Sequence, residues 1–316
     1  MLVQIYDAAM FQLNQITLNG RTCPRLSDVT LTISSGRTAI VGYSGAGKTS
    51  LLNVLAGFEQ ANAGTVRTVL KGDPAETASR TARLPLYWVP QNGGLWPHLT
   101  VDQHLSCVGS AESSDKLLRS LDLEYRRSAL PAELSLGERS RLALARALAT
   151  RAEVLLLDEP LSHVDPVRKP AYWNVIREII GTVSTSPEQR EASIVFTSHE
   201  PETVLRHSEN VICLREGRVV FQGTTASLYD SPPSREVGEF LGPLNWFGAE
   251  EAAVFVHDQN PGTGVSAIRP ERMIMVADSG SSIEFVSMPF RGGYAESIVR
   301  HVASGRTRTV LHQVPG

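Results

Sequence analysis

Residues 42 to 49 have the types and the spacing that a phosphate-binding loop requires. Their sequence, GYSGAGKT, matches the pattern G-x-x-x-x-G-K-[ST], in which glycines let backbone N–H groups approach an anion closely. An apolar run precedes the loop and a helical pattern follows it, so these N–H groups would lie at the positive end of a helix. A glycine-rich surface turn is the alternative, and the flanking patterns argue against it.

The same pattern assigns chemistry to individual side chains. We expect Lys48 to reach the β and γ phosphates of a nucleotide, and the Thr49 hydroxyl to ligate Mg²⁺. The residues expected to contact the nucleotide from this loop are Gly42, Tyr43, Ser44, Gly45, Ala46, Gly47, Lys48, Thr49 and Ser50.

Two acidic residues, Asp158 and Glu159, follow the apolar run Val154–Leu157. Open α/β sheets bind ligands at the carboxyl ends of their strands. Asp158 is therefore the expected partner of Mg²⁺, through water, and Glu159 the expected general base that orients or deprotonates an attacking water. The alternative is an ordinary acidic turn after a core strand, which the phosphate loop makes the weaker interpretation.

Two more polar residues follow apolar runs and should lie at the same sheet edge. His199 comes after the run Ile194–Thr197, and we expect it to contact the γ-phosphate. Gln91 comes after the run Leu86–Val89, and it could supply a neutral oxygen to Mg²⁺ or position the water. Each residue alone is a weak indication, because a lone histidine after a strand is more often structural than catalytic.

The elements that must position these residues alternate between short apolar runs and helical patterns, which predicts an α/β fold with a largely parallel sheet. Continuous apolar runs are typical of strands buried on both faces, and they occur at 38–41, 86–89, 154–157, 194–197 and 211–214. Val29, Leu31 and Ile33 alternate with polar residues, as in a half-exposed strand. A turn at Glu216-Gly217 predicts a hairpin, and residues 100–150 have helical patterns that Pro131 interrupts.

Composition narrows the class of protein. The chain has 316 residues, 42% of them hydrophobic and 20% charged, which is typical of a folded globular protein. Its net charge of −3 gives no indication of nucleic-acid binding, and no apolar run approaches the roughly 18 residues of a membrane-spanning helix. Three scattered cysteines and an N-terminus without a basic lead before its apolar residues predict a reduced, intracellular protein that is soluble by itself.

With these residues assembled, the chain over residues 11–245 resembles an ATP-binding cassette (ABC) ATPase. Gly42–Thr49 corresponds to the family's Walker A motif, Val154–Glu159 to Walker B, Gln91 to the glutamine loop and His199 to the switch histidine. Residues 134–138, LSLGE, resemble the signature L-S-G-G-Q, and residues 162–165 resemble the D-loop. The resemblance implies a P-loop NTPase fold of the ABC type, with an antiparallel β subdomain and an inserted helical subdomain.

The resemblance also implies a second copy of the chain. In the family the signature faces ATP held by the other subunit, so Ser135, Gly137, Glu138 and Asp165 would contact the partner's nucleotide. ATP binding would close a head-to-tail dimer and hydrolysis would reopen it. The chain departs from the pattern where Leu136 replaces the first signature glycine and Glu138 replaces the glutamine, and no aromatic residue stands near residues 19–21 to stack on adenine. The helical insertion is compact, with 44 positions from Gln91 to Ser135.

Three weaker similarities favour an importer subunit. Gly93–Val101 is similar to the segment where a permease docks, which an exposed Leu95-Trp96 would suit, although Trp96 could equally pack into the helical subdomain. Ser227–Tyr229 and Glu239–Gly242 resemble the cassette's end in such importers. Ala267–Glu271, AIRPE, resembles the start of their C-terminal TOBE-like (OB-fold) β domain.

The expected organisation rests on these similarities and on a change of composition after Tyr229, where Ser231–Ser234 opens a looser segment and a domain boundary is expected near 231–245. Residues 1–235 would form the ATPase domain with the helical subdomain at about 98–150, residues 236–264 a linker, and residues 265–316 a small β-rich segment. The expected partners are a second copy, integral membrane permease subunits and a solute-binding protein, at the cytoplasmic face of the membrane. A soluble cassette ATPase of DNA repair or translation is the alternative, but such proteins usually carry a long coiled coil or two cassettes, and the sequence shows neither.

Overall fold

The chain divides into two compact units, Met1–Gly223 and Thr224–Gly316. The computed structural model describes residues 9–68, 86–109, 111–182, 192–256, 266–276, 278, 280–289 and 293–313. All residues predicted to act on a nucleotide lie in the first unit. No helix among these described residues is long and apolar enough to cross a membrane.

A six-stranded sheet forms the centre of the first unit, in the order β5-β6-β7-β3-β8-β9. The strands are β3 (Arg37–Val41), β5 (Leu86–Val89), β6 (Val154–Leu157), β7 (Ser193–Thr197), β8 (Asn210–Arg215) and β9 (Arg218–Thr224). The pairs from β5 to β8 are parallel, and β6 and β7 are buried throughout, which confirms the five predicted apolar strands. Between β8 and β9, Glu216 and Gly217 have φ of 49° and 76°, values that suit the predicted two-residue hairpin turn.

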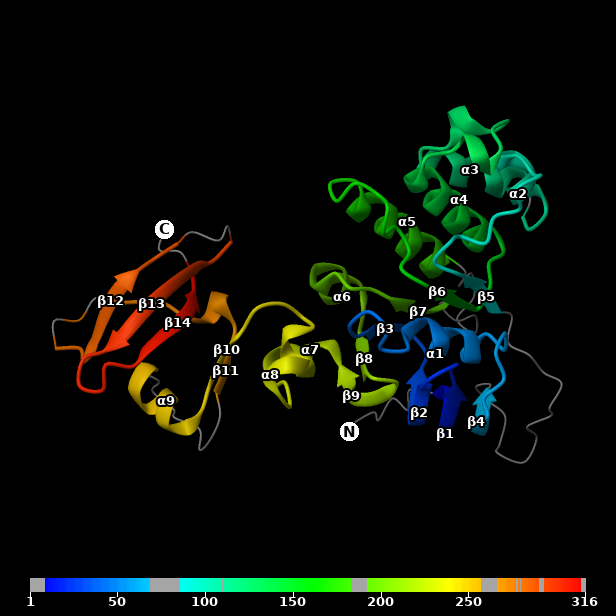
Figure 1. Ribbon diagram of the computed structural model, residues 1–316. Coiled ribbons are helices and arrows are strands. Elements are labelled where there is room, and N and C mark those ends of the chain that lie inside the picture. The colour runs from blue at the N-terminus through cyan, green and yellow to red at the C-terminus, as the bar shows by residue number, and fades with distance from the viewer. Residues whose placement is uncertain are drawn as a thin grey trace, which may run out of the picture. The chain divides into compact units, whose positions relative to one another are not determined.

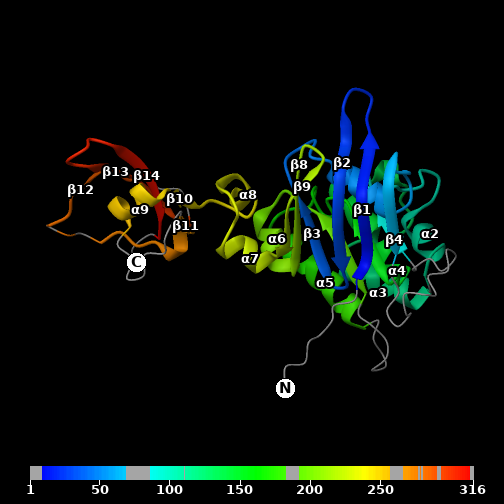
Figure 2. The ribbon, with the colours of Figure 1, turned by 90° about the horizontal axis from the view of Figure 1, so that it is seen from below.

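A second sheet supports the phosphate loop from beside the first. It is antiparallel, in the order β2-β1-β4, with β1 (Ala9–Asn19), β2 (Pro24–Ser34) and β4 (Ala63–Thr68); Figure 2 shows these strands side by side. Val29, Leu31 and Ile33 of β2 are buried at alternate positions, as predicted. They share one hydrophobic core with Leu51 and Leu52 of helix α1 (Lys48–Leu55), which follows the loop.

The predicted helical subdomain is present. It contains α2 (Val101–Ser106), α3 (Ala111–Ser120) and α4 (Leu136–Ala149), grouped at one end of the unit in Figure 1. Short 3-10 turns at Glu124–Arg126 and Pro131–Glu133 separate α3 from α4, so the helical pattern is interrupted at Pro131 as expected. Two further helices, α5 (Lys169–Thr182) and α6 (Pro201–His207), flank β7 in the chain.

The second unit begins earlier than predicted. It contains α7 (Thr225–Asp230), α8 (Arg235–Glu239), β10 (Asn245–Phe247), α9 (Ala249–Phe255), β11 (Ser266–Ile268), β12 (Ile283–Ser287), β13 (Ala295–His301) and β14 (Thr307–His312), with a 3-10 turn at Pro270–Arg272. The stretch 236–264, predicted as a linker, contains most of α8 together with β10 and α9 up to residue 255, and residues 257–265 lie outside the described residues.

Long-range contacts explain why these residues are structured. Asn245 Nδ2 donates to Leu311 O at 2.6 Å and its Oδ1 accepts from Leu311 N at 2.8 Å. Phe247 is fully buried with Val299 and Val310. The β-rich prediction for the C-terminal segment agrees with the sheets β10-β11 and β12-β13-β14.

Candidate nucleotide site

The predicted phosphate loop forms the turn between β3 and α1. Gly42 and Gly47 have φ of 154° and 102°, a region that suits glycine. A Cβ on Gly47 would lie 2.6 Å from Arg25 O, and one on Gly42 would lie 2.4 Å from Leu214 O. Both positions therefore exclude side chains, because the loop is pressed against neighbouring backbone.

Lys48 is folded over this loop. Its Nζ donates to Gly42 O at 2.7 Å and to Tyr43 O at 3.2 Å. Burial lowers the pKa of Lys48, and the nearby carboxylates of Glu159 and Asp158 partly offset that effect. The lysine thus places a cation, held by carbonyl oxygens, where the loop would receive phosphate.

Asp158 joins the ends of three elements. The register aligns Val89 of β5 with Leu157 of β6, and Asp158 N donates to Val89 O at 2.9 Å. Its carboxylate is almost fully buried, with Oδ2 accepting from Thr49 Oγ1 at 2.7 Å and Oδ1 accepting from Thr197 Oγ1 at 2.6 Å. Two of the three predicted magnesium-binding side chains, Thr49 and Asp158, therefore lie in direct contact.

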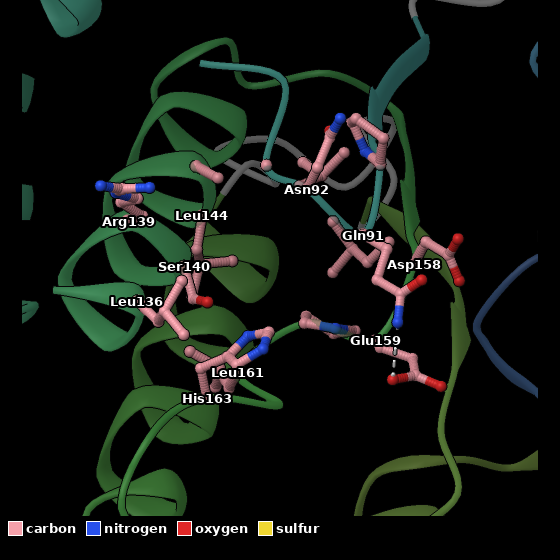
Figure 3. A pocket seen from close by; sticks show the side chains of 16 residues that line it. Gln91, Asn92, Leu136, Arg139, Ser140, Leu144, Asp158, Glu159, Leu161 and His163 are labelled. Atoms are coloured by element: carbon pink, nitrogen blue, oxygen red, sulfur yellow. Dashed lines mark hydrogen bonds between the residues drawn. The ribbon is translucent and has the colours of Figure 1, made fainter. Parts of the chain in front are cut away.

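Glu159 lies between the other two predicted residues. Gln91 Nε2 donates to Glu159 Oε2 at 3.3 Å, drawn as a dashed line in Figure 3, and His199 Nδ1 lies 3.4 Å from Glu159 Oε1. The structure thus brings together three residues that are far apart in sequence, and it places the Gln91 amide beside the predicted base. Their assigned roles stay predictions.

A pocket of about 190 Å³ opens beside Glu159. Figure 3 shows Gln91, Asp158 and Glu159 on one side of it, and Leu136, Ser140 and Leu144 of α4 on the other. Leu161, which follows Walker B, and His163 of the D-loop also line this pocket. The signature helix therefore forms a wall of the space that adjoins the predicted base.

The signature residues lie at the start of α4. Ser135 is the N-cap, with Oγ accepting from Glu138 N at 3.2 Å and N donating to Glu138 Oε2 at 2.8 Å. A Cβ on Gly137 would lie 3.0 Å from His163 O, so the signature and the D-loop approach closely. Asp165 itself ends the D-loop, where its Oδ1 accepts from Val167 N at 2.8 Å.

Three of the residues predicted to contact a nucleotide, Glu138, Ala46 and Ser50, are buried. The Glu138 side chain is only 6% exposed and points inward, because Arg126 Nε and Tyr125 OH donate to its Oε1 at 2.9 and 2.8 Å. Glu138 therefore serves its own chain as a cap and is not an open ligand group. Ala46 of the phosphate loop and Ser50 in the first turn of α1 are 5% and 7% exposed.

Trp96 packs against the helical subdomain, which is the alternative that the sequence left open beside an exposed docking residue. Its ring stacks on His104 at 5.4 Å and lies 4.4 Å from the Arg146 guanidinium. Arg146 in turn donates to Gly93 O and Gly94 O at 3.2 and 2.8 Å. Trp96 still keeps 38% of its surface exposed, and the segment after Gln91 is tied to α4.

Sequence reasoning missed Thr197 and Arg126. Thr197 is fully buried, and its Oγ1 bridges Asp158 and the backbone N–H of Glu159, from which it accepts at 2.8 Å. Its position two residues before the predicted His199, at the end of a strand, is a signal that could have found it. Arg126 has no such signal, because its partner Glu138 lies twelve positions later, beyond a 3-10 turn and in the first turn of α4.

These features define a P-loop nucleotide-binding protein, with glycine loop, lysine, hydroxyl and carboxylates at the carboxyl ends of parallel strands. A family model described as ABC transporter matches residues 26–162. The sulfate/thiosulfate import ATP-binding protein CysA 2 of Shewanella oneidensis is 33% identical over 238 residues, which cover 71% of this chain and 64% of the relative. The Fe(3+) ions import ATP-binding protein FbpC 2 of Pectobacterium atrosepticum is 32% identical over 246 residues, which cover 74% of this chain and 68% of the relative.

Solved structures agree on the fold. The ATP-binding subunit of an ABC transporter superposes with a TM-score of 0.58 at 23% identity, covering 70% of this chain and 92% of that one. A bacterial ABC transporter cassette in a dimeric structure gives a TM-score of 0.57 at 23% identity, covering 68% and 98%. The chain belongs to the family of ABC transporter ATP-binding proteins, and its relatives are ATP-binding proteins of import systems. It spans 64% and 68% of the length of the two relatives named.

Proposed function

We propose that this chain hydrolyses ATP as the energy-coupling subunit of an ABC importer. The observation that carries the proposal is the Glu159 carboxylate, positioned by Gln91 and His199 beside the phosphate loop. A carboxylate within reach of a water next to a γ-phosphate can act as its general base.

The loop backbone, Lys48, Glu159 and His199 have separate tasks in this reaction. The backbone N–H groups of the glycine loop bind phosphate oxygens at the N-terminus of α1. Lys48 exchanges its carbonyl partners, Gly42 O and Tyr43 O, for the β and γ phosphates. Glu159 accepts the proton of the attacking water, and His199 contacts the γ-phosphate.

The donor set also fits Mg²⁺. Thr49 and Asp158 supply hydroxyl and carboxylate oxygens in contact with each other, with Gln91 nearby, and oxygen ligands are those that Mg²⁺ prefers. Among the described residues no group of three or more His, Cys, Asp or Glu side chains is placed to hold a metal. Mg²⁺ is usually held by one or two carboxylates together with substrate phosphates. When bound, Mg²⁺ would neutralise charge that develops on the phosphates.

A second copy of the chain completes the site in this proposal. Ser135, Gly137 and the first turn of α4 present a hydroxyl, a bare backbone and a helix N-terminus, all of which suit phosphate. This chain has the same fold as an ABC transporter cassette whose structure is dimeric, and that similarity supports a dimer in this proposal. ATP would hold two copies together head to tail, and hydrolysis would release them.

We infer the partner proteins from the names of the relatives. Their names state sulfate or thiosulfate, Fe(3+) ions, and spermidine or putrescine, at 33%, 32% and 32% identity to this chain. Because solutes so different share similar ATP-binding proteins, we assign solute choice to separate permease subunits and a solute-binding protein. The chain would bind the permease at the cytoplasmic face of the membrane, and the strands β11 to β14 would form a TOBE-like domain.

The proposal is tested with the purified chain and one carboxylate variant. Glu159→Gln should keep ATP binding, lower the ATPase rate by about 100-fold or more, and accumulate an ATP-bound dimer in analytical ultracentrifugation. Glu153→Gln, an exposed carboxylate before the start of β6, is the matched control and should turn over normally. Normal turnover by Glu159→Gln would exclude Glu159 as the base.

Coupling to transport needs a separate experiment. Tagged chain should sediment with membranes when the permease subunits are coexpressed, and should stay in the supernatant without them. Binding to DNA or ribosomes in the absence of any membrane partner would contradict the importer assignment.

A further inference from the structure

The buried carboxylate of Glu138, in the signature segment, is held by two partly or largely exposed side chains from the turn before it, Arg126 and Tyr125. Glu138 Oε2 accepts from Ser135 N at 2.8 Å, and Oε1 accepts from Arg126 Nε at 2.9 Å and from Tyr125 OH at 2.8 Å. Both carboxylate oxygens are thus used inside the chain. The Arg126 guanidinium also lies 5.3 Å from the centre of the Tyr125 ring.

Glu138 presents an electrostatic problem at this place. It lies in the first turn of α4, at the helix end that the proposed function turns toward the phosphates of a second copy. A carboxylate that rotated outward there would occupy the N-terminal N–H groups and repel an approaching phosphate. The inward orientation avoids both effects and leaves Ser135 exposed at the surface.

Arg126 neutralises the Glu138 carboxylate in its inward position. Among the described residues it is the only one that forms an ion pair with Glu138. The neighbouring arginines of α4 are engaged elsewhere: Arg139 donates to Leu134 O and Arg141 to Leu121 O and Asp122 O. Arg126 belongs to the separate turn Glu124–Arg126, so its position depends on the packing of the helical subdomain.

We propose that Arg126 is a positioning residue, which holds Glu138 inward so that the signature can accept the phosphates of ATP bound to a second copy. This inference rests on the proposed function, since it concerns the signature in the composite site. The paired carboxylate anchors the Ser135 backbone, and the start of α4 then offers hydroxyl and N–H groups without an exposed negative charge. Tyr125 supplies the second donor to the same oxygen.

The test compares charge removal at Arg126 with its compensation at Glu138, in the Glu159→Gln background that stabilises an ATP-bound dimer. Arg126→Met leaves Oε1 with Tyr125 alone and should weaken ATP-dependent dimerisation about tenfold, the size expected for one charge-assisted hydrogen bond. ATP binding to the monomer, measured with a fluorescent nucleotide, should stay within about twofold. In the otherwise unchanged chain Arg126→Met should raise the KM for ATP more than it lowers kcat.

Two further variants make the result specific. Adding Glu138→Gln to Arg126→Met removes the uncompensated charge and should restore dimerisation to within about threefold, whereas Arg126→Lys should restore it partly. Arg119→Met, which removes the exposed Arg119–Glu124 pair of the same subdomain, is the matched control and should change nothing.

The outcomes separate this inference from the proposed function. A chain that neither hydrolyses ATP nor dimerises as Glu159→Gln overturns the proposed function itself. If that dimer forms and Arg126→Met behaves as Arg119→Met does, the role of Arg126 is overturned. If the double variant dimerises as poorly as Arg126→Met, the loss comes from the turn's structure rather than from charge, and the inference is equally overturned.

Discussion

Replacing Thr197 by valine should damage both stability and turnover, because one buried hydroxyl holds two parts of the site. Thr197 Oγ1 donates to Asp158 Oδ1 at 2.6 Å and accepts from Glu159 N at 2.8 Å. A hydrogen bond to a charged group contributes about 1.5–3 kcal/mol, and an unsatisfied buried N–H costs about 1–3 kcal/mol. Since the two effects share one atom and are not additive, we expect Thr197→Val to lower the free energy of unfolding by about 2–4 kcal/mol.

The same variant should lower kcat about tenfold or more, with a smaller change in the KM for ATP. A tenfold decrease corresponds to about 1.4 kcal/mol of activation free energy, which is less than the stability lost with the two hydrogen bonds of Thr197. Urea denaturation and steady-state ATPase assays measure the two effects. Thr197→Ser is the matched control: it keeps the hydroxyl, removes one methyl group at about 1 kcal/mol of stability, and should stay within about threefold in kcat. Equal stability and equal kcat for the valine and serine variants would refute the reasoning.

Two other predictions test charges of the site. Lys48→Ala removes the cation beside the phosphates and should weaken ATP binding by about 10–100-fold in calorimetry, whereas Lys116→Ala, an exposed lysine, should not; equal affinities would remove Lys48 from the phosphate site. Burial raises the pKa of Glu138, but hydrogen bonds from Ser135, Arg126 and Tyr125 outweigh it and lower that pKa from 4.5 to about 2. The stability that Glu138 contributes is thus complete above about pH 4.5 and is lost as pH falls toward 2, so wild type should lose more stability than Glu138→Gln between pH 5 and 3 in urea denaturation. Parallel losses for both proteins would contradict this.

The strands and the phosphate loop could be predicted because their signals are local. A run such as Val154–Leu157 is apolar at every position because β6 is buried on both faces, and these four consecutive residues are enough to show the pattern. The loop is equally visible, because Gly42 and Gly47 are the residues that permit its positive φ and its close approach to other backbone.

The remaining features depend on contacts that sequence spacing does not show. Thr197 ends an apolar run two residues before His199, which marks its place at the sheet edge, but the sequence does not show that its hydroxyl meets Asp158 and Glu159 at the end of β6. The inward turn of Glu138 depends on Arg126, twelve residues earlier. The structure of residues 245–247 depends on Leu311 at the far end of the chain, which is why a composition-based prediction took this stretch for a linker.

The position of the proposed base shows how such contacts decide function. In an extended strand successive side chains point to opposite faces, so Asp158 and Glu159 would diverge if β6 simply continued. Glu159 instead has φ of 49°, and Leu161 has φ of 66°, a left-handed conformation that costs non-glycine residues about 1–3 kcal/mol each. This turn lets both carboxylates serve one site, and it persists because surrounding contacts hold it: the Glu159 N–H is fixed by Thr197, its carboxylate meets Gln91 and His199, and Leu161 is buried. The direction of the proposed base is therefore set by a strained backbone that Thr197 of the neighbouring strand β7 keeps in place.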